Sequence, residues 1–486
     1  MEYQRPSSTP QLKPRLIIHG GAGNITPEKL GPEGYAEYRE ALLTIVSRTN
    51  TYMTTPTPNY PGALEAATHA VIQLEENPLF NSGRGAVFTR DGTNELEASV
   101  MVSRGRAKRG VGVTGLRTVR SPIRLARAML ERGDADLAAP APAPRGVDAQ
   151  PGEGVWYPNL DVPSAQAHTL IHGATAEALA VKYGIPLVEP GWFYTRRRWE
   201  EHVRALERER AGKGVASWSP DEYLPQGTCG AVALDAEGVV CVATSTGGLT
   251  NKLTGRIGDT PVPGAGFWAE EWMVELEHGR DSSRVTPGPV EDTLQSARRY
   301  LSSLPGPVVQ LSSNLRMLLA DCLPTPFMYA PIEREQELQT QTTRSIAMSG
   351  TGNGDSFLRV AAVRSVASIA RWGGQSGADA MGQIAGRGGE LQRSAGERWG
   401  QTGEGEGGMI GIESVVSRDE EGRVVGTRSE ILQDHNCAGM FRAWIDDDGK
   451  AVMRIWPTDE DKAQGRVEIF EGEGRAEDVW RWSEKA

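Results

Sequence analysis

The sequence has few of the features that mark secreted, membrane-spanning or metal-binding proteins. Its 486 residues include only four cysteines, at positions 229, 241, 322 and 437, and their spacing fits neither a disulfide framework nor a zinc site. No apolar run reaches the roughly eighteen residues that a spanning helix needs. The opening Met-Glu-Tyr-Gln-Arg-Pro has no apolar segment like that of a signal peptide. We therefore expect a cytoplasmic protein.

An excess of positive charge is also missing. The formal net charge is −11, which argues against nucleic acid or an anionic membrane as a partner. Basic clusters at 104–109 and 196–198 are expected to be solvated surface. The seven histidines form no ligand or triad pattern, and we expect His19 to close a strand. The sequence thus gives no reason to require a cofactor.

Apolar spacing predicts a framework of strands and helices. A strand is expected at 16–19, and helices are expected at 62–76, 122–131, 165–183 and 196–210. Other segments are rich in polar residues, glycine or proline and interrupt this framework. They are a mobile tail (1–14), an Ala/Pro-rich insertion (137–154), a flexible linker (211–225) and two later insertions (279–345 and 386–408). Strands and helices should segregate into layers.

The motif Gly227-Thr228-Cys229-Gly230 is the most informative one. Thr228 opens an apolar run, and a turn at 236–238 leads to a second run that ends in Thr244-Ser245-Thr246-Gly247-Gly248. This pattern predicts a β-hairpin. A threonine at the start of a strand is common, because β-branched residues favour strands.

Thr228 can also be a nucleophile. Cleavage of the bond before it would free its own α-amino group as the base. That group titrates at about 7.7–8.0, close to working pH. Gly227 suits the precursor, because glycine tolerates strained backbone.

Four blocks of sequence together resemble one known family. They are Ile18–Gly23, Leu74–Gly83, the stretch from Gly227 to Gly266, and Ser349–Asp355. The third block contains Gly-Thr-x-Gly-Ala-Val-Ala, Ala-Thr-Ser-Thr-Gly-Gly, Asn-Lys, Gly-Arg-x-Gly-Asp-x-Pro and Gly-Ala-Gly in that order. With these motifs the chain resembles the plant-type (type 2) asparaginase and isoaspartyl peptidase family, threonine N-terminal-nucleophile (Ntn) hydrolases. The resemblance extends from residue 15 to about 445, with insertions.

The resemblance implies an α+β fold, a four-layer αββα sandwich. It implies self-cleavage into an α fragment (1–227) and a β fragment (228–486). Two such cleaved αβ units would form a dimer. The product would be a hydrolase that releases L-aspartate from L-asparagine or β-aspartyl (isoaspartyl) peptides. A glycosylasparaginase-like hydrolase, a taspase-like protease and a non-catalytic binding protein with this fold are the alternatives.

Several residues are assigned roles in the site. The resemblance makes Thr246 the partner that orients Thr228, and Asn81 the contact of the free threonine amine. Thr351 and Gly352 offer a hydroxyl and a backbone N–H side by side, which suits an oxyanion hole. Gly350, Gly352 and Gly354 could instead form a loop that binds a phosphate, but the full dinucleotide fingerprint is missing.

Arg256 and Asp259 suit an amino-acid head group. A guanidinium can hold the α-carboxylate and a carboxylate can hold the α-ammonium. An isolated Arg-x-x-Asp pair is more often a surface ion pair. Asn353 and Asp355 stand where the family usually has histidine and glutamate, which leaves the substrate preference open.

The resemblance also implies a possible structural sodium ion. Backbone carbonyls of one loop would hold it, namely those of Leu74, Glu75, Asn77, Phe80, Ser82 and Arg84.

Overall fold

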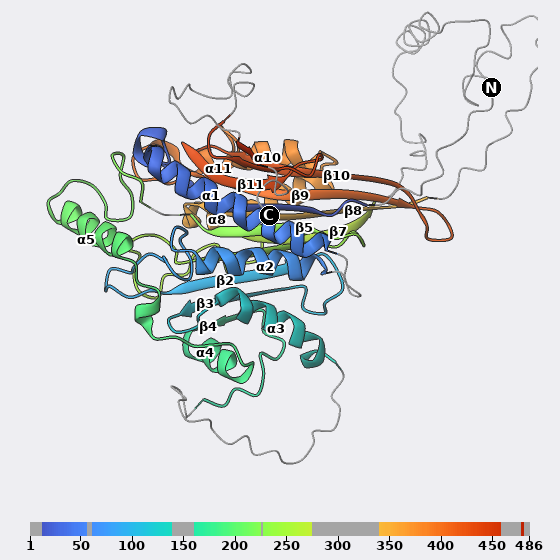
Figure 1. Cartoon of the computed structure of the whole chain (residues 1–486), viewed down its shortest axis with the longest axis horizontal. Coiled ribbons are helices and arrows are strands. Elements are labelled where there is room, and N and C mark those ends of the chain that lie inside the picture. The colour runs from blue at the N-terminus through green and yellow to red at the C-terminus, as the bar shows by residue number, and fades with distance from the viewer. Residues whose placement is uncertain are drawn as a thin grey trace, which may run out of the picture. The chain divides into compact units, whose positions relative to one another are not determined.

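The computed structural model describes most of the chain. The described residues are 12–55, 61–138, 160–224, 227–274 and 340–457, with the backbone of 478–480. The chain divides into one unit of residues 1–273 and 341–486 and a second unit of residues 274–340, which lies almost wholly outside the described residues. The architecture below is that of the first unit, a mixed α+β structure with two sheets (Figure 1).

The larger sheet contains the predicted hairpin at its centre. Its strand order is β13-β12-β11-β1-β5-β6-β2-β3-β4, antiparallel except for the parallel pair β3–β4. Its strands are β1 (Arg15–Gly23), β2 (Leu96–Val102), β3 (Gly110–Leu116), β4 (Leu170–His172), β5 (Cys229–Leu234), β6 (Val240–Thr246), β11 (Gly439–Ile445), β12 (Ala451–Arg454) and β13 (Asp478–Trp480). Strands β5 and β6 pair with Cys229 opposite Ser245, which confirms the hairpin.

The smaller sheet has the order β10-β9-β8-β7. Its strands are β7 (Phe267–Val274), β8 (Gln341–Gly352), β9 (Gly407–Arg418) and β10 (Val424–His435). Strand β8 already begins at Gln341, inside the expected insertion at 279–345, and β9 begins inside the one at 386–408. Most of the first of these insertions, and most of the Ala/Pro-rich one, lie outside the described residues.

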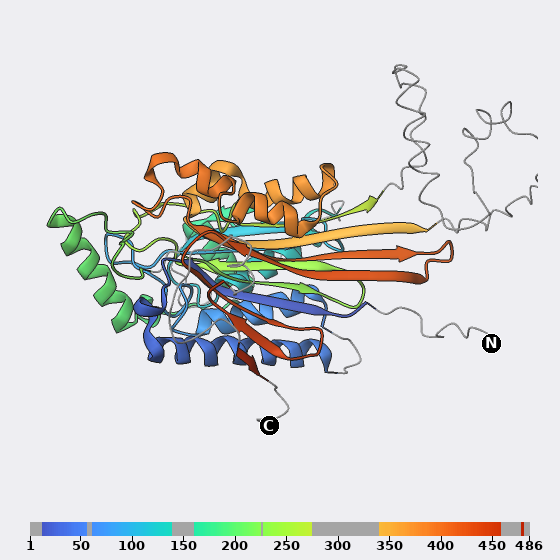
Figure 2. The ribbon, with the colours of Figure 1, turned by 90° about the horizontal axis from the view of Figure 1, so that it is seen from above.

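Helices pack against the outer face of each sheet. On the larger sheet these are α1 (Pro27–Thr54), α2 (Ala63–Glu76), α3 (Pro122–Asp136) and α4 (Gly173–Lys182). On the smaller sheet lie α8 (Gly354–Val360), α9 (Ala362–Trp372), α10 (Gly377–Ala385) and α11 (Glu390–Ala395). The two groups lie on opposite sides of the strands (Figure 2). Helix α5 (Arg196–Arg210) and the short 3-10 turns η1 (Pro190–Trp192) and η2 (Gly396–Arg398) complete the elements.

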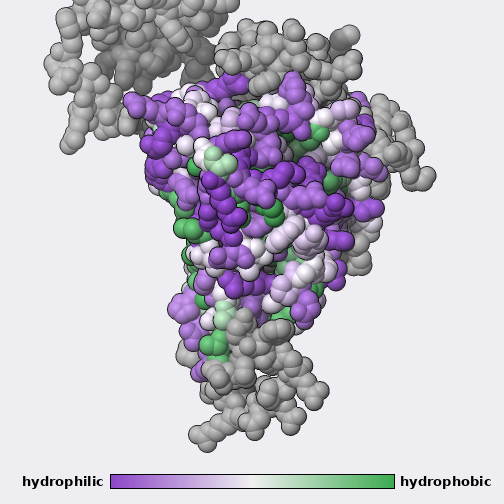
Figure 3. Space-filling model, turned by 90° about the vertical axis from the view of Figure 1, so that its left-hand side faces the viewer, coloured by the Kyte–Doolittle hydropathy of each residue, from purple (hydrophilic) through white to green (hydrophobic). Residues whose placement is uncertain are grey.

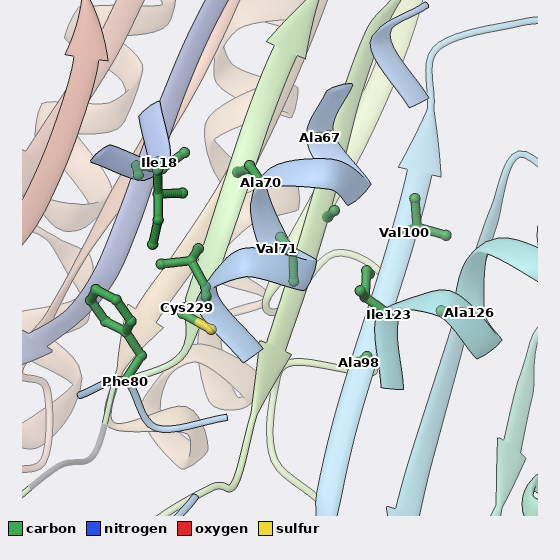
Figure 4. Packing of buried hydrophobic residues seen from close by; sticks show 14 of the residues in the cluster. Ile18, Ala67, Ala70, Val71, Phe80, Ala98, Val100, Ile123, Ala126 and Cys229 are labelled. Carbon is green, nitrogen blue, oxygen red and sulfur yellow. The ribbon is translucent and has the colours of Figure 1, made fainter. Parts of the chain in front are cut away.

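Separate apolar clusters fill the spaces between these elements. Beneath α2 and α3, small side chains such as Ala67 and Ala70 let the helices approach the large sheet closely (Figure 4). A second cluster joins Val232 and Val242 of the large sheet to Ile410 of the small one. The inner faces of the two sheets therefore share a core.

The helix predictions are largely confirmed. Helices α2, α3 and α5 lie where the apolar spacing places them. The helix expected over 165–183 is wrong in its first half, because Leu170–His172 instead pairs as a parallel strand with β3. Leu12 is buried in the core between the sheets, so the described end of the expected tail is packed.

Candidate active site

Thr228 lies immediately before β5, with 3% of its surface exposed and its bond to Gly227 intact. Gly227 has no space for a side chain. An added Cβ would lie 2.5 Å from the backbone nitrogen of Ala22, 2.6 Å from Cα of Gly21 and 2.7 Å from Thr351 Oγ1. Gly227 does not adopt a positive φ, so close packing, not backbone strain of that kind, explains the glycine.

Asn81 contacts the carbonyl of the bond before the threonine. Its Nδ2 donates to the Gly227 carbonyl at 3.3 Å and to the Gly248 carbonyl at 2.8 Å. Its Oδ1 accepts from the Val87 N–H at 3.0 Å, which fixes the orientation of the amide. In this uncleaved chain the Asn81 amide therefore contacts the carbonyl of the Gly227–Thr228 bond.

Thr351 and Gly352 end strand β8 beside the threonine. The Thr351 hydroxyl donates to the Thr228 carbonyl at 3.0 Å, one peptide away from the Gly227 carbonyl. Gly352 has a φ of 140°, and an added Cβ would lie 2.4 Å from the Glu406 carbonyl oxygen. Only glycine fits there. The two predicted oxyanion donors are thus adjacent to Thr228, although neither contacts the Gly227 carbonyl here.

The hydroxyl that contacts Thr228 is not the predicted one. Thr228 Oγ1 and Thr260 Oγ1 are 2.8 Å apart, a hydrogen bond in which either can donate. The Thr246 hydroxyl instead accepts from the Gly248 N–H at 3.0 Å. The sequence reading missed Thr260, and the one available signal was its place directly after Asp259 in the same motif.

Arg256 and Asp259 converge on Gly354. An added Cβ on Gly354 would lie 2.4 Å from Asp259 Oδ1 and 3.0 Å from Arg256 Nη2. Arg256 pairs at 3.0 Å with Asp355, which is half exposed. Both Arg256 Nε and Asp259 Oδ2 are buried and lack a hydrogen-bond partner within the described structure. These two charged groups therefore retain capacity to bind a polar ligand.

Burial changes the acid-base behaviour of Asp259. It raises the pKa of this carboxyl to about 7, and the nearby Arg256 partly offsets that shift. Glu97 supports the turn that carries Arg256 and Asp259, because its carboxylate accepts the Gly258 N–H at 3.1 Å. Glu97 also accepts the Thr114 hydroxyl at 2.9 Å, so its position is fixed on both sides.

The loop that carries Asn81 is held by a buried arginine that sequence reasoning did not assign. Arg198 of α5 donates to the Leu79 carbonyl at 2.7 Å and to the Gly85 carbonyl at 2.9 Å. Its remaining Nη group pairs with Glu201 at 2.8 Å. In the sequence it lies in one of the basic clusters expected to be solvated surface. That expectation is wrong for this residue, which is 2% exposed.

The same loop brings several backbone carbonyls together. Gly85 has a φ of 109°, and an added Cβ would lie 2.4 Å from the Pro78 carbonyl oxygen and 2.9 Å from that of Phe80. The Pro78 and Phe80 carbonyls thus lie close to the Gly85 backbone. The carbonyls of Leu74, Glu75 and Asn77 accept N–H groups within the loop, and each keeps a second lone pair. No group of three or more His, Cys, Asp or Glu side chains suited to a metal occurs among the described residues.

His19 is buried beneath the Thr228 backbone, in the middle of β1 instead of at its end. Its Nε2 shares a hydrogen bond of 2.7 Å with Ser349 Oγ. Burial lowers the pKa of His19 to about 3, opposed by its contact with the Thr228 backbone. The ring is therefore neutral at physiological pH and serves to support the strand.

Part of the flexible linker expected at 211–225 is packed: residues 211–215 are exposed, but several residues of 216–224 are buried. Trp218 Nε1 donates to Glu406 Oε2 at 3.3 Å, and Lys29 Nζ donates to the Pro220 carbonyl at 2.7 Å. Leu224 is buried against α5. A cavity of about 500 Å³ lies between this segment, α1 and α5. The molecular face that carries α5 is mainly hydrophilic (Figure 3).

None of the described helices combines the length and apolar character needed to cross a membrane.

Comparison with known proteins identifies the family. The pattern of a family described as asparaginase matches residues 12–139 and 161–275. The isoaspartyl peptidase of Escherichia coli (strain K12) is 36% identical over 262 residues, 54% of this chain and 69% of that protein. The plant-type L-asparaginase of Pyrococcus furiosus is 33% identical over 264 residues, 53% of this chain and 70% of that protein. The isoaspartyl peptidase/L-asparaginase of Xenopus laevis is 31% identical over 262 residues, 53% of this chain and 67% of that protein.

The family match includes Asn81, Thr228, Thr246, Arg256 and Asp259, and it ends before Thr351. The matched residues therefore include Thr228, the Asn81 side chain that contacts the Gly227 carbonyl, and the pair of Arg256 and Asp259. The chain belongs to the asparaginase family of plant-type asparaginases and isoaspartyl peptidases, which are Ntn hydrolases.

Proposed function

We propose that this protein is a threonine amidohydrolase that cleaves itself before Thr228 and then hydrolyses the β-amide of L-asparagine or of β-aspartyl peptides. The observation that carries the proposal is the contact of Asn81 Nδ2 with the Gly227 carbonyl, because it joins a polarising donor to the bond before a buried threonine. The two sheets and their flanking helices support a four-layer αββα Ntn fold.

In the first phase Thr228 Oγ attacks the Gly227 carbonyl carbon. A new C–O bond forms and the C–N bond breaks, while the hydroxyl proton ends on the Thr228 nitrogen, which becomes an amine. Asn81 stabilises the charge that develops on the Gly227 oxygen. Water then hydrolyses the ester, which releases the carboxylate of Gly227 and restores the Thr228 hydroxyl. The free α-amine of Thr228 can now act as a base.

In the second phase the freed Thr228 attacks the β-carbonyl of an aspartyl substrate. Arg256 holds the α-carboxylate and the unpaired Oδ2 of Asp259 accepts the α-ammonium. Thr351 and Gly352 serve as oxyanion donors once the Gly227 side has departed. The amine or ammonia leaves with a proton from the α-amine, and water resolves the β-aspartyl ester.

A sodium ion in the loop of residues 74–84 would stiffen the backbone around Asn81. The carbonyls of Leu74, Glu75, Asn77, Phe80, Ser82 and Arg84 would hold it. Arg198 binds two other carbonyls of the same loop, so it would act beside the ion.

The test is a comparison of the parent protein with Thr228→Ala. We expect the parent to give two fragments on a denaturing gel and, once cut, to release aspartate from β-aspartyl dipeptides or ammonia from L-asparagine. Thr228→Ala should stay uncut and inactive. A parent chain that intact-mass spectra show only at full length after prolonged incubation would refute the proposal. Equal turnover of L-glutamine would refute the aspartyl assignment, because an added methylene would carry the carbonyl past Thr228.

A further inference from the structure

We propose that the Thr260 hydroxyl is a catalytic partner of Thr228 in self-cleavage, where it orients the attacking Oγ before the α-amine exists. This inference rests on the proposed function. It assigns the first phase of the reaction to a hydroxyl different from the one that the family resemblance assigns to Thr228.

The geometry singles out Thr260. Its Oγ1 lies 2.8 Å from that of Thr228, and both residues are at least 97% buried, so bulk water does not compete for the bond. The backbone of Thr260 is also held firmly. Its carbonyl accepts the Ser99 hydroxyl at 2.6 Å, and an added Cβ on Gly266 would lie 2.9 Å from its Cα. The backbone position of Thr260 is therefore fixed, so its hydroxyl can orient the Thr228 hydroxyl.

Other polar groups near Thr228 make their hydrogen bonds to groups other than its hydroxyl in this uncleaved chain. The Thr246 hydroxyl accepts from the Gly248 N–H, and the Thr351 hydroxyl donates to the Thr228 carbonyl. His19 Nε2 is paired with Ser349. The Thr228 nitrogen is still an amide, whose lone pair is delocalised into the carbonyl, so it cannot yet serve as the base.

The role of Thr260 follows from these contacts. When the Thr228 hydroxyl donates a hydrogen bond to Thr260 Oγ1, the Thr228 side-chain rotamer is fixed while its oxygen lone pairs stay available for attack. Thr260 gains and loses no atom. The C–O bond forms, the C–N bond breaks, and the proton of Thr228 ends on its own nitrogen. After cleavage the freed α-amine of Thr228 can serve as the base.

The experiment compares Thr260→Val, Thr260→Ser and a matched control, Thr68→Val. Thr68 is a buried threonine of α2 whose hydroxyl donates to the Leu64 carbonyl of its own helix. The readouts are the rate of self-cleavage on denaturing gels and the melting temperature of each variant.

We expect Thr260→Val to slow self-cleavage about ten- to hundredfold, as the loss of one hydrogen bond at a reacting atom would do. Thr260→Ser should restore most of the rate, and Thr68→Val should cleave like the parent.

Cleavage of Thr260→Val at the parental rate would overturn the inference. Equal slowing by the valine and serine variants would also overturn it, because shape and not the hydroxyl would then matter. Equal slowing in Thr68→Val would show that the loss of any buried hydroxyl slows cleavage, and this would overturn the inference too. A parent chain that never cleaves would instead refute the proposed function itself.

Discussion

Replacement of Gly227 by alanine tests the geometry of the scissile bond most directly. The added methyl would lie within 2.7 Å of three atoms, two of them in the backbone of Gly21 and Ala22. Backbone cannot move aside as a flexible side chain can, so residue 227 must shift. Overpacking of this kind costs about 1–3 kcal/mol of stability.

The expected loss of self-cleavage is larger than the loss of stability. Asn81 Nδ2 already reaches the Gly227 oxygen at 3.3 Å, near the long limit for an N–H···O bond. A shift of a few tenths of an ångström would break this contact. Loss of one oxyanion donor typically slows a reaction about 10²–10³-fold. We therefore expect Gly227→Ala to cleave at least about a hundredfold more slowly.

The assay is the appearance of the two fragments on denaturing gels during incubation, together with the melting temperature. Gly191→Ala is the matched control, because an added Cβ there meets nothing within 4 Å. It should cleave and melt like the parent. Self-cleavage of Gly227→Ala at the parental rate would refute the reasoning, because it would show that Asn81 need not hold the carbonyl in this geometry.

Three further predictions address the rest of the site. KM for β-aspartyl dipeptides should fall as pH rises from 6 to 8, because the pKa of Asp259 is raised to about 7 and only the ionised carboxylate binds an ammonium group. Steady-state assays in which KM does not depend on pH would contradict this. Arg256→Ala should self-cleave normally on gels yet lose about 10–150-fold in kcat/KM, because a charge-assisted contact to the substrate is worth about 1.5–3 kcal/mol. Unchanged hydrolysis would show that Arg256 only pairs with Asp355 and does not bind the substrate. Arg198→Met should lower the free energy of unfolding by about 3 kcal/mol, because the Gly85 carbonyl loses its arginine donor, the Leu79 carbonyl keeps only the Tyr38 hydroxyl, and Glu201 keeps only Arg197. Urea unfolding measures this, and a loss under about 1 kcal/mol would show that the loop does not depend on Arg198.

Local patterns predicted much of the framework. The hairpin of β5 and β6 follows from two β-branched runs around a Gly-containing turn, and it places Thr228 at the start of a strand. Helices α2 and α3 follow from apolar residues at helical spacing. The helix expected over 165–183 failed in part, because pairing of Leu170–His172 with β3 outweighed its helical pattern.

The sequence alone determined the family, the candidate nucleophile and the residue types of the charged pair, because each lies within one short stretch of chain. Tertiary structure decided which atoms meet. Thr228 could have faced either Thr246 or Thr260, which are chemically equivalent in the sequence, and only the fold of the turn after Asp259 selects the second. Arg198 looked like surface charge until the loop carbonyls enclosed it. Such contacts join residues far apart in the chain, and they depend on distances of a few tenths of an ångström that no periodic pattern encodes.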